Sequence, residues 1–173
     1  SDVVPRTGVF PLSFSLDHVG PLARTVDDCA AVFAAIAGTD ARSPKAEAGL
    51  TGALDGVSIG IVRHFHEEAG GADAALIAGL EEAAMMLAGL GAEVRPCTLP
   101  PLAEFAACGR VIQQAESYAV HADWLARRPE DYSAASLRKL LPGAFLAAAD
   151  YVAAQQKRRE LCYRYAAALD GFD

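Results

Sequence analysis

The spacing of hydrophobic residues changes from irregular to helical near Thr25. Between residues 5 and 21, apolar residues alternate with Pro and Gly, which predicts an extended or irregular segment. Beyond Thr25 the apolar residues recur at helical intervals, at Val26, Cys29, Ala30, Phe33, Ile36 and Ala37. Thr25 can cap this helix and Gly38 can end it. Because the helix is apolar in nearly every turn, we expect it to be well buried.

The middle of the chain has the pattern of a β-α-β unit. After a loop-like stretch at 39–54, the sequence VSIGIV (57–62) predicts a short buried strand. The stretch ADAALIAGLEEAAMMLAGLG (72–91) predicts a helix that begins at an Asp73 cap and ends at Gly91. AEVRPCTLP (92–100) predicts a second strand. A strand, a helix and a strand in this order should place the two strands parallel and adjacent.

From Leu102 onward the pattern is helical. We expect a long helix to about residue 128, a shorter one at 133–141 after a break at Pro129, and a last one at 147–169. The predicted fold class is therefore α/β, with a few strands, at least one parallel βαβ unit and four or five helices.

Composition narrows the class of protein. The chain has 173 residues, 53% of them apolar and 21% charged, which fits one ordered globular domain. Lys and Arg number 15 against 22 Asp and Glu, and the net charge of −7 argues against nucleic acid or an anionic membrane as a partner. No apolar run is long enough to span a bilayer and no signal peptide is visible, so we expect a cytoplasmic protein.

The four cysteines, Cys29, Cys97, Cys108 and Cys162, form no C-x-x-C pair. Three of them lie in Ala-rich helical patterns. This usage predicts small buried thiols in a reducing compartment.

HFHEE (64–68) is the most suggestive polar cluster. On an extended segment His64 and His66 would project to the same face, as a metal site requires. A closed site needs further ligands, however, and the sequence places none. A solvated loop after the strand is the more ordinary interpretation, so we predict neither a metal nor a cofactor.

Ser13 and Ser15 do not have the surroundings of a nucleophile. PLSFSLD (11–17) lacks a G-x-S-x-G elbow, and on an extended segment Asp17 and His18 point to opposite faces. We therefore assign both serines to structure. The chain also contains no Gly-rich phosphate loop of the G-x-G-x-x-G or G-x-x-x-x-G-K-[ST] kind.

QQAESYAVHADW (113–124) places several polar and aromatic residues close together on the long helix. Tyr118 and His121 are an i, i+3 pair and can share a face. That face can line a substrate pocket, or it can be a helix rim packed by Trp124. Tyr118 and His121 are therefore candidates for pocket lining. The residues by themselves show no complete catalytic set.

GVFPLSFSLDHVGPLARTVDDCAAVFAAIAGTD (8–40) resembles the amidase signature family, the serine amidohydrolases that cleave carboxamides. The matching segment of the family lies just downstream of its Gly/Ser-rich signature. The resemblance is carried by Gly8, Pro11, Ser13, Ser15, Leu16, Asp17, Gly20, Pro21, Ala23, Arg24, Thr25, Val26 and Asp28, then by Ala37, Gly38 and Asp40. LDGVSIGIV, GLGAEVRPCTLP, Ala115-Glu116, PEDYS and AADYVAAQQKRREL resemble later parts of the family more weakly. The resemblance thus extends over essentially the whole chain.

The resemblance implies that residues 1–173 are a single partial domain, the middle to C-terminal part of an amidase signature domain. Its fold would be a fragment of a mixed β-sheet flanked by α-helices. The family's triad of a lysine, a serine in a cis peptide and a nucleophilic serine lies upstream of the first residue, so no residue of this chain is expected to be catalytic. The extended run at 11–21 would pack beneath the active site, and the helix after it would pin that run to the sheet.

The implied function is that of the full-length protein. It would hydrolyse the C–N bond of a small-molecule carboxamide through a serine acyl-enzyme without a cofactor, whereas the isolated chain would be inactive. Two alternatives stay open: a glutamine-hydrolysing protein similar to the A-subunit of amidotransferases, and a non-catalytic scaffold domain derived from the fold. Exposed sheet edges would also favour self-association of the chain.

Overall fold

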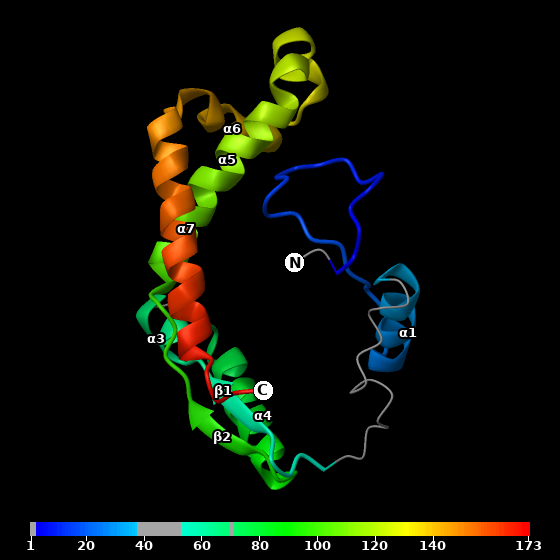
Figure 1. Cartoon of the computed structure of the whole chain (residues 1–173), viewed down its shortest axis with the longest axis vertical. Coiled ribbons are helices and arrows are strands. Elements are labelled where there is room, and N and C mark those ends of the chain that lie inside the picture. The colour runs from blue at the N-terminus through cyan, green and yellow to red at the C-terminus, as the bar shows by residue number, and fades with distance from the viewer. Residues whose placement is uncertain (1–2, 38–52, 70) are drawn as a thin grey trace. The chain divides into compact units, whose positions relative to one another are not determined.

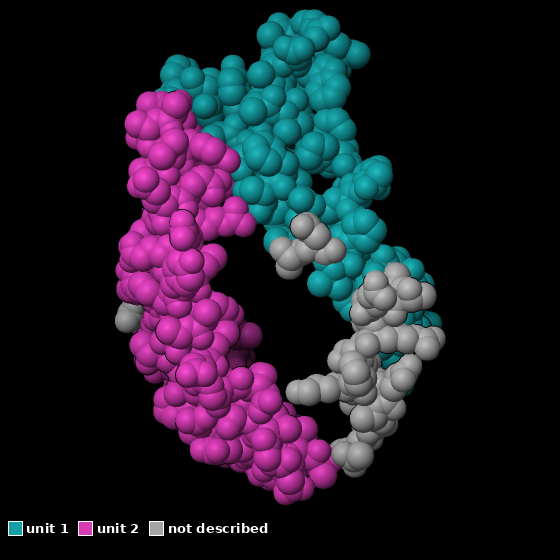
Figure 2. Space-filling view, in the orientation of Figure 1, with its two compact units in different colours: residues 1–51, 113–145 teal, residues 52–112, 146–173 magenta. Residues whose placement is uncertain are grey.

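The computed structural model describes residues 3–37, 53–69 and 71–173. Gly38, Asp40 and most of the loop predicted at 39–54 lie outside the described residues. The chain forms two compact units (Figure 2). The first unit comprises the described part of residues 1–51 together with 113–145, and the second comprises 52–112 together with 146–173. The single partial domain inferred for residues 1–173 stays a prediction.

The second unit is built around a parallel pair of strands, as predicted. β1 (Ser58–Ile61) pairs with β2 (Glu93–Pro96), with Ser58 opposite Glu93 (Figure 1). The strands are connected through α4 (Ala74–Gly89), whose first turn is capped by the Asp73 carboxylate accepting from the Ala75 N–H. Gly91 follows the helix with a φ of +103°, a conformation that favours glycine. The βαβ unit and both ends of its helix are confirmed.

Helices close the second unit. Residues 102–112 of α5 (Leu102–Arg127) belong to this unit, and so does the whole of α7 (Ala148–Ala168). The buried Cys108 thiol donates to the carbonyl oxygen of Ala154 on α7, at 3.1 Å. At the C-terminus the Arg95 guanidinium lies 4.6 Å from the centroid of the Phe172 ring, and the Asp173 N–H donates to the Ser58 carbonyl of β1. The last residues of the chain are thereby held against the sheet.

Two corrections concern the second unit. HFHEE is helical, because α3 (His64–Ala69) begins there, so six α-helices occur in the described ranges instead of four or five. On a helix His64 and His66 are about 200° apart and do not share a face. Within the residues that the structure describes, no group of three or more His, Cys, Asp or Glu side chains is arranged to hold a metal ion.

All four cysteines are free, but they are not all buried. Cys97 and Cys108 are buried and Cys29 is half-buried, whereas Cys162 is exposed. The prediction of a buried thiol is therefore wrong for Cys162, because an Ala-rich helical pattern does not identify which face of the helix is covered.

The first unit begins with an irregular segment and α1 (Val26–Ala37). The Thr25 hydroxyl accepts from the Asp28 N–H at 3.1 Å, which confirms the predicted cap. The predicted burial of this helix is wrong: α1 has no buried residue, and Val26 is 74% exposed. An apolar helix face must be covered by a partner element, and none of the described residues buries this one.

The remainder of the first unit comes from α5 and the residues that follow it. Residues 113–127 of α5 lead through a short 3₁₀ turn, Pro129–Asp131, to α6 (Ala134–Leu140). Ser133 caps α6 by accepting from the Ser136 N–H, and a second 3₁₀ turn, Leu141–Phe145, follows directly. None of the described helices is long and apolar enough to cross a bilayer.

Candidate functional site

Residues 9–19, which we term the pocket loop, are folded by the carboxylate of Asp17. Asp17 Oδ2 accepts from the backbone N–H groups of Leu12, at 2.8 Å, and of Ser13, at 3.0 Å. The carbonyl oxygen of Ser13 in turn accepts from the N–H groups of Leu16 and Asp17, at 2.9 and 2.8 Å. An Asp side chain that bonds nearby backbone N–H groups is a common way to stabilise a turn.

A second carboxylate, Glu116 of α5, holds the same loop from the helix side. Glu116 Oε2 accepts from the Ser13 hydroxyl at 2.6 Å and from the Ser15 N–H at 2.9 Å. Ser13 is 2% exposed and Glu116 is 1% exposed, so the bond between their side chains is made away from water. Hydrogen bonds to an ionised carboxylate are shorter and stronger than those between neutral groups. Glu116 therefore anchors the pocket loop to α5.

In this geometry the Ser13 side chain and the Ser15 backbone both hold the loop to Glu116. The Ser13 hydroxyl is buried and donates to Glu116, so a substrate cannot reach it. Asp17 is occupied by loop N–H groups, and His18 is exposed with Nδ1 at 2.6 Å from the Leu16 carbonyl oxygen. The Ser, His and Asp side chains of this loop do not form a catalytic relay.

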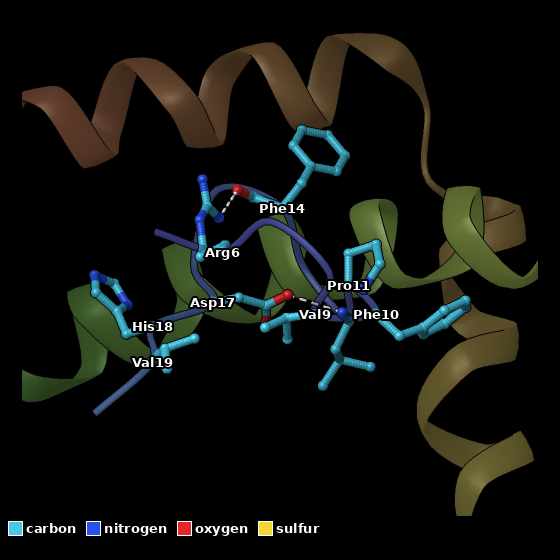
Figure 3. A pocket seen from close by; sticks show the side chains of 9 residues that line it. Arg6, Val9, Phe10, Pro11, Phe14, Asp17, His18 and Val19 are labelled. Carbon is cyan, nitrogen blue, oxygen red and sulfur yellow. Dashed lines mark hydrogen bonds between the residues drawn. The ribbon is translucent and has the colours of Figure 1, made fainter. Parts of the chain in front are cut away.

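The pocket loop surrounds a pocket of about 370 Å³ (Figure 3). The lining is mostly apolar and includes polar groups at its margins: Arg6, Val9, Phe10, Pro11, Leu12, Phe14, Asp17, His18 and Val19. The Arg6 guanidinium donates to the Phe14 carbonyl and so joins the two sides of this region. Small-molecule sites typically combine an apolar lining with a few polar groups. The pocket is therefore our candidate site.

His121 belongs to an aromatic cluster beside the pocket loop. Its ring centroid lies 5.7 Å from that of Phe10 and 6.1 Å from that of Trp124, and Phe10 and Trp124 are 5.4 Å apart. His121 Nδ1 is 2.8 Å from the hydroxyl of Tyr132, whose ring meets the imidazole edge-on. The predicted site residue His121 is thus brought close to the loop by aromatic packing.

Tyr118 has a different neighbour. Its Cβ lies next to Gly143 in the 3₁₀ turn that follows α6. The lining of the loop pocket is drawn from residues 6–19 and includes neither Tyr118 nor His121. The role of these two residues in lining a substrate pocket stays a prediction.

Sequence reasoning missed Glu116 as a site residue. The signal was a single acidic residue between Ala115 and Ser117 on a helix, and two serines alternating with apolar residues in the loop. The two parts are 103 residues apart, so neither the pattern of the helix nor that of the loop identifies the other.

The chain was compared with proteins of known sequence and structure. The A-subunit of the glutamyl-tRNA(Gln) amidotransferase from Clostridium botulinum (strain Loch Maree / Type A3) is 35% identical over 122 residues, covering 66% of this chain and 25% of the relative. A crystal structure of an amidase has a TM-score of 0.78 at 27% identity, covering 94% of this chain and 35% of that chain. Peptide amidase from Stenotrophomonas maltophilia has a TM-score of 0.68 at 26% identity, covering 97% and 41%.

The chain thus spans about a quarter of the length of the amidotransferase relative that it matches. The family model described as Amidase matches residues 1–173. The α/β fold, with its parallel pair of strands and its helices, is shared with these amidase structures. The chain belongs to the Amidase family.

Proposed function

We propose that this chain is part of an amidase that hydrolyses carboxamide C–N bonds through a serine acyl-enzyme. Its role is to form one wall of the substrate pocket with the pocket loop and to hold that wall in place through α5. The observation that carries this proposal is the pocket loop: the stretch with the strongest resemblance to the family also lines a pocket and is anchored to α5 by Glu116.

In this proposal the reacting groups come from outside residues 1–173. A serine hydroxyl, activated by a lysine through a second serine, attacks the amide carbonyl, and the C–N bond breaks as ammonia or an amine leaves. Water then hydrolyses the acyl-serine ester, and backbone N–H groups stabilise the oxyanion in both steps. No cofactor takes part.

Ammonia release tests this proposal directly. This chain and the full-length enzyme in which it would lie are incubated with several small carboxamides, and the ammonia is measured. We expect activity from the full-length enzyme alone. Turnover by the chain itself would contradict the assignment of all reacting groups to other residues, and a full-length protein inactive on every amide would favour a non-catalytic scaffold.

Tyr118 and His121 are proposed to contribute to substrate choice through α5. His121 contacts Phe10, which lines the pocket, so its removal would change the support of that wall. In the full-length enzyme, His121→Ala and Tyr118→Ala should alter the ratio of kcat/KM values between a small and an aromatic amide. Unchanged ratios across the substrate set would refute a role for either residue.

A second candidate function is that of one component of an amidotransferase. It is favoured by the 35% identity to the A-subunit of a glutamyl-tRNA(Gln) amidotransferase. Such a component would release ammonia from glutamine and would act together with partner proteins. Preference for glutamine over simple amides, together with co-purification of partners in a fixed ratio, would select this candidate over a free-standing amidase.

A further inference from the structure

We propose that Glu116 is the positioning residue of the pocket: it sets the shape of the pocket loop without touching a ligand. Only the kinetic part of this inference rests on the proposed function. The structural part concerns this chain alone and is tested separately.

The residues bonded to Glu116 and the residues that line the pocket are immediate neighbours in the loop. Ser13, and the N–H of Ser15, are bonded to Glu116, whereas Leu12 and Phe14 line the pocket. Residues 14–16 form a turn in which the Leu16 and Asp17 N–H groups donate to the Ser13 carbonyl, and Phe14 lies between the two residues that are bonded to Glu116. Because Ser13 lies between Leu12 and Phe14 and Ser15 follows directly, the bonds to Glu116 determine where the Leu12 and Phe14 side chains stand.

Two carboxylates fix this short segment, and they do so differently. Asp17 is part of the loop and bonds N–H groups a few residues away, so it shapes the turn locally. Glu116 lies on α5 and is nearly fully buried, so it fixes the turn at Ser13 and Ser15 to the helix, beside the packing of Phe10 on the α5 aromatic residues. When a buried acceptor is removed, its donors lose their partner, and the segment is free to move toward water.

The protein carries a reporter of this position. Trp124 is the single tryptophan in the sequence, and it lies on α5, as Glu116 does. Its ring is 5.4 Å from that of Phe10, which belongs to the pocket loop. Trp124 is 46% exposed, so displacement of Phe10 would change both its emission and its access to a quencher.

The first experiment uses this chain and measures Trp124 fluorescence with acrylamide quenching. Glu116→Ala removes the acceptor, whereas Glu116→Gln keeps an oxygen that can accept both bonds. We expect Glu116→Ala to raise the quenching constant about twofold, and Glu116→Gln to stay close to the wild type. Far-UV circular dichroism reports whether each variant remains helical.

Two further variants sharpen this experiment. Ser13→Ala removes one donor and leaves the buried carboxylate in place, so it should give a smaller change of the same sign even if Glu116→Ala fails to fold. Ser117→Ala is the matched control, because Ser117 is also buried and adjacent, but its hydroxyl donates to Gln114 within α5. Unchanged quenching in both folded Glu116→Ala and Ser13→Ala, or an equal change in Ser117→Ala, would overturn the inference.

The second experiment measures amide hydrolysis in the full-length enzyme. Because Glu116 would position a binding wall and not the reacting groups, we expect Glu116→Ala to raise KM about tenfold with kcat within about twofold, and Glu116→Gln to restore most of the loss. A variant that is merely less stable would lower the active fraction, and so kcat, at constant KM. A fall in kcat alone, or an unchanged KM despite altered fluorescence, would overturn the kinetic part. If the wild-type full-length protein hydrolyses no amide, that result would contradict only the proposed function.

Discussion

At Gly143 the chain passes so close to α5 that no side chain fits. A Cβ at this position would lie 2.1 Å from the carbonyl oxygen of Gln114 and 2.5 Å from the Cβ of Tyr118. Both neighbours belong to a helix, so neither can move aside cheaply. We expect Gly143→Ala to lower the free energy of unfolding by about 1–3 kcal/mol, as overpacking does in other proteins, measured by urea denaturation.

Gly109 of α5 provides the matched control. A Cβ there would meet nothing within 4 Å, and alanine favours a helix over glycine. Gly109→Ala should therefore stabilise the protein by about 0.5–1 kcal/mol. Equal stability of Gly143→Ala and the wild type would show that the turn at 141–145 does not pack on α5 in this way.

The candidate site could be predicted from the sequence only in part. The strongest resemblance, in residues 8–40, includes the pocket loop, and the Pro and Gly residues between 5 and 21 predicted an irregular backbone. The residues predicted to line a pocket, Tyr118 and His121, lie on α5 and not in the loop. The bonds from Ser13 and Ser15 to Glu116 could not be predicted, because they join groups 103 and 101 residues apart. Side-chain pairing over such distances depends on the tertiary fold, which local patterns do not encode.

At the scale of elements, helix and strand type followed the hydrophobic spacing well. Both ends of α4 lie where predicted, because Asp73 caps its first turn and Gly91, with a positive φ, follows its last. α3 was missed because its six residues are too few to show a helical period. The burial of α1 was wrong because periodicity shows that a face is apolar but not what covers it.

A cluster of charges joins the first turn of α5 to α7. Glu104 is 2.7 Å from Lys157 and 2.9 Å from Arg164, and both cations also pair with Glu160. The hydrogen bond from Lys157, followed by that from Arg164, lowers the pKa of Glu104 and of Glu160 below the ordinary 4.5. The bond to Glu104, followed by that to Glu160, raises the pKa of Lys157 above 10.5.

These shifts predict how stability depends on pH. A carboxyl group whose pKa is lowered by folding stabilises the fold above its unfolded pKa, and this contribution is lost as the pH falls through the folded value. Lys157 acts in the opposite sense: its contribution is present below 10.5 and is lost as the pH rises through its raised value. We expect Glu104→Gln to be destabilising at neutral pH, with the difference from the wild type shrinking toward about pH 3.

Urea denaturation across this pH range measures the effect. The side chains of the cluster are 30–51% exposed, so high salt should also reduce the difference at neutral pH. Glu82→Gln, a neutralisation of an exposed residue on α4, is the control and should give a small effect at every pH. A constant difference between Glu104→Gln and the wild type from neutral to acid pH would contradict a role for these ion pairs.

At the scale of the whole molecule, several large apolar side chains of the described residues are exposed on the same helices. α4 has Leu76 and Met85 each 69% exposed and Met86 63% exposed, and in α1 no residue is buried. The sheet consists of two strands in the described residues. Contiguous exposed apolar surface favours association.

We therefore expect this chain to self-associate, and the exposed side of α4 to contribute as well as the sheet edges. Light scattering after size exclusion should give a mass that rises with concentration. Met86→Glu should shift the equilibrium toward the monomer, because burying an added carboxylate in an apolar contact is costly. Gln156, an exposed residue of α7, provides the control: Gln156→Glu adds the same charge without removing apolar surface. It separates the loss of an apolar contact from general repulsion at a net charge of −7. A monomer at every concentration would refute self-association, and equal shifts in both variants would exclude α4 as the contact.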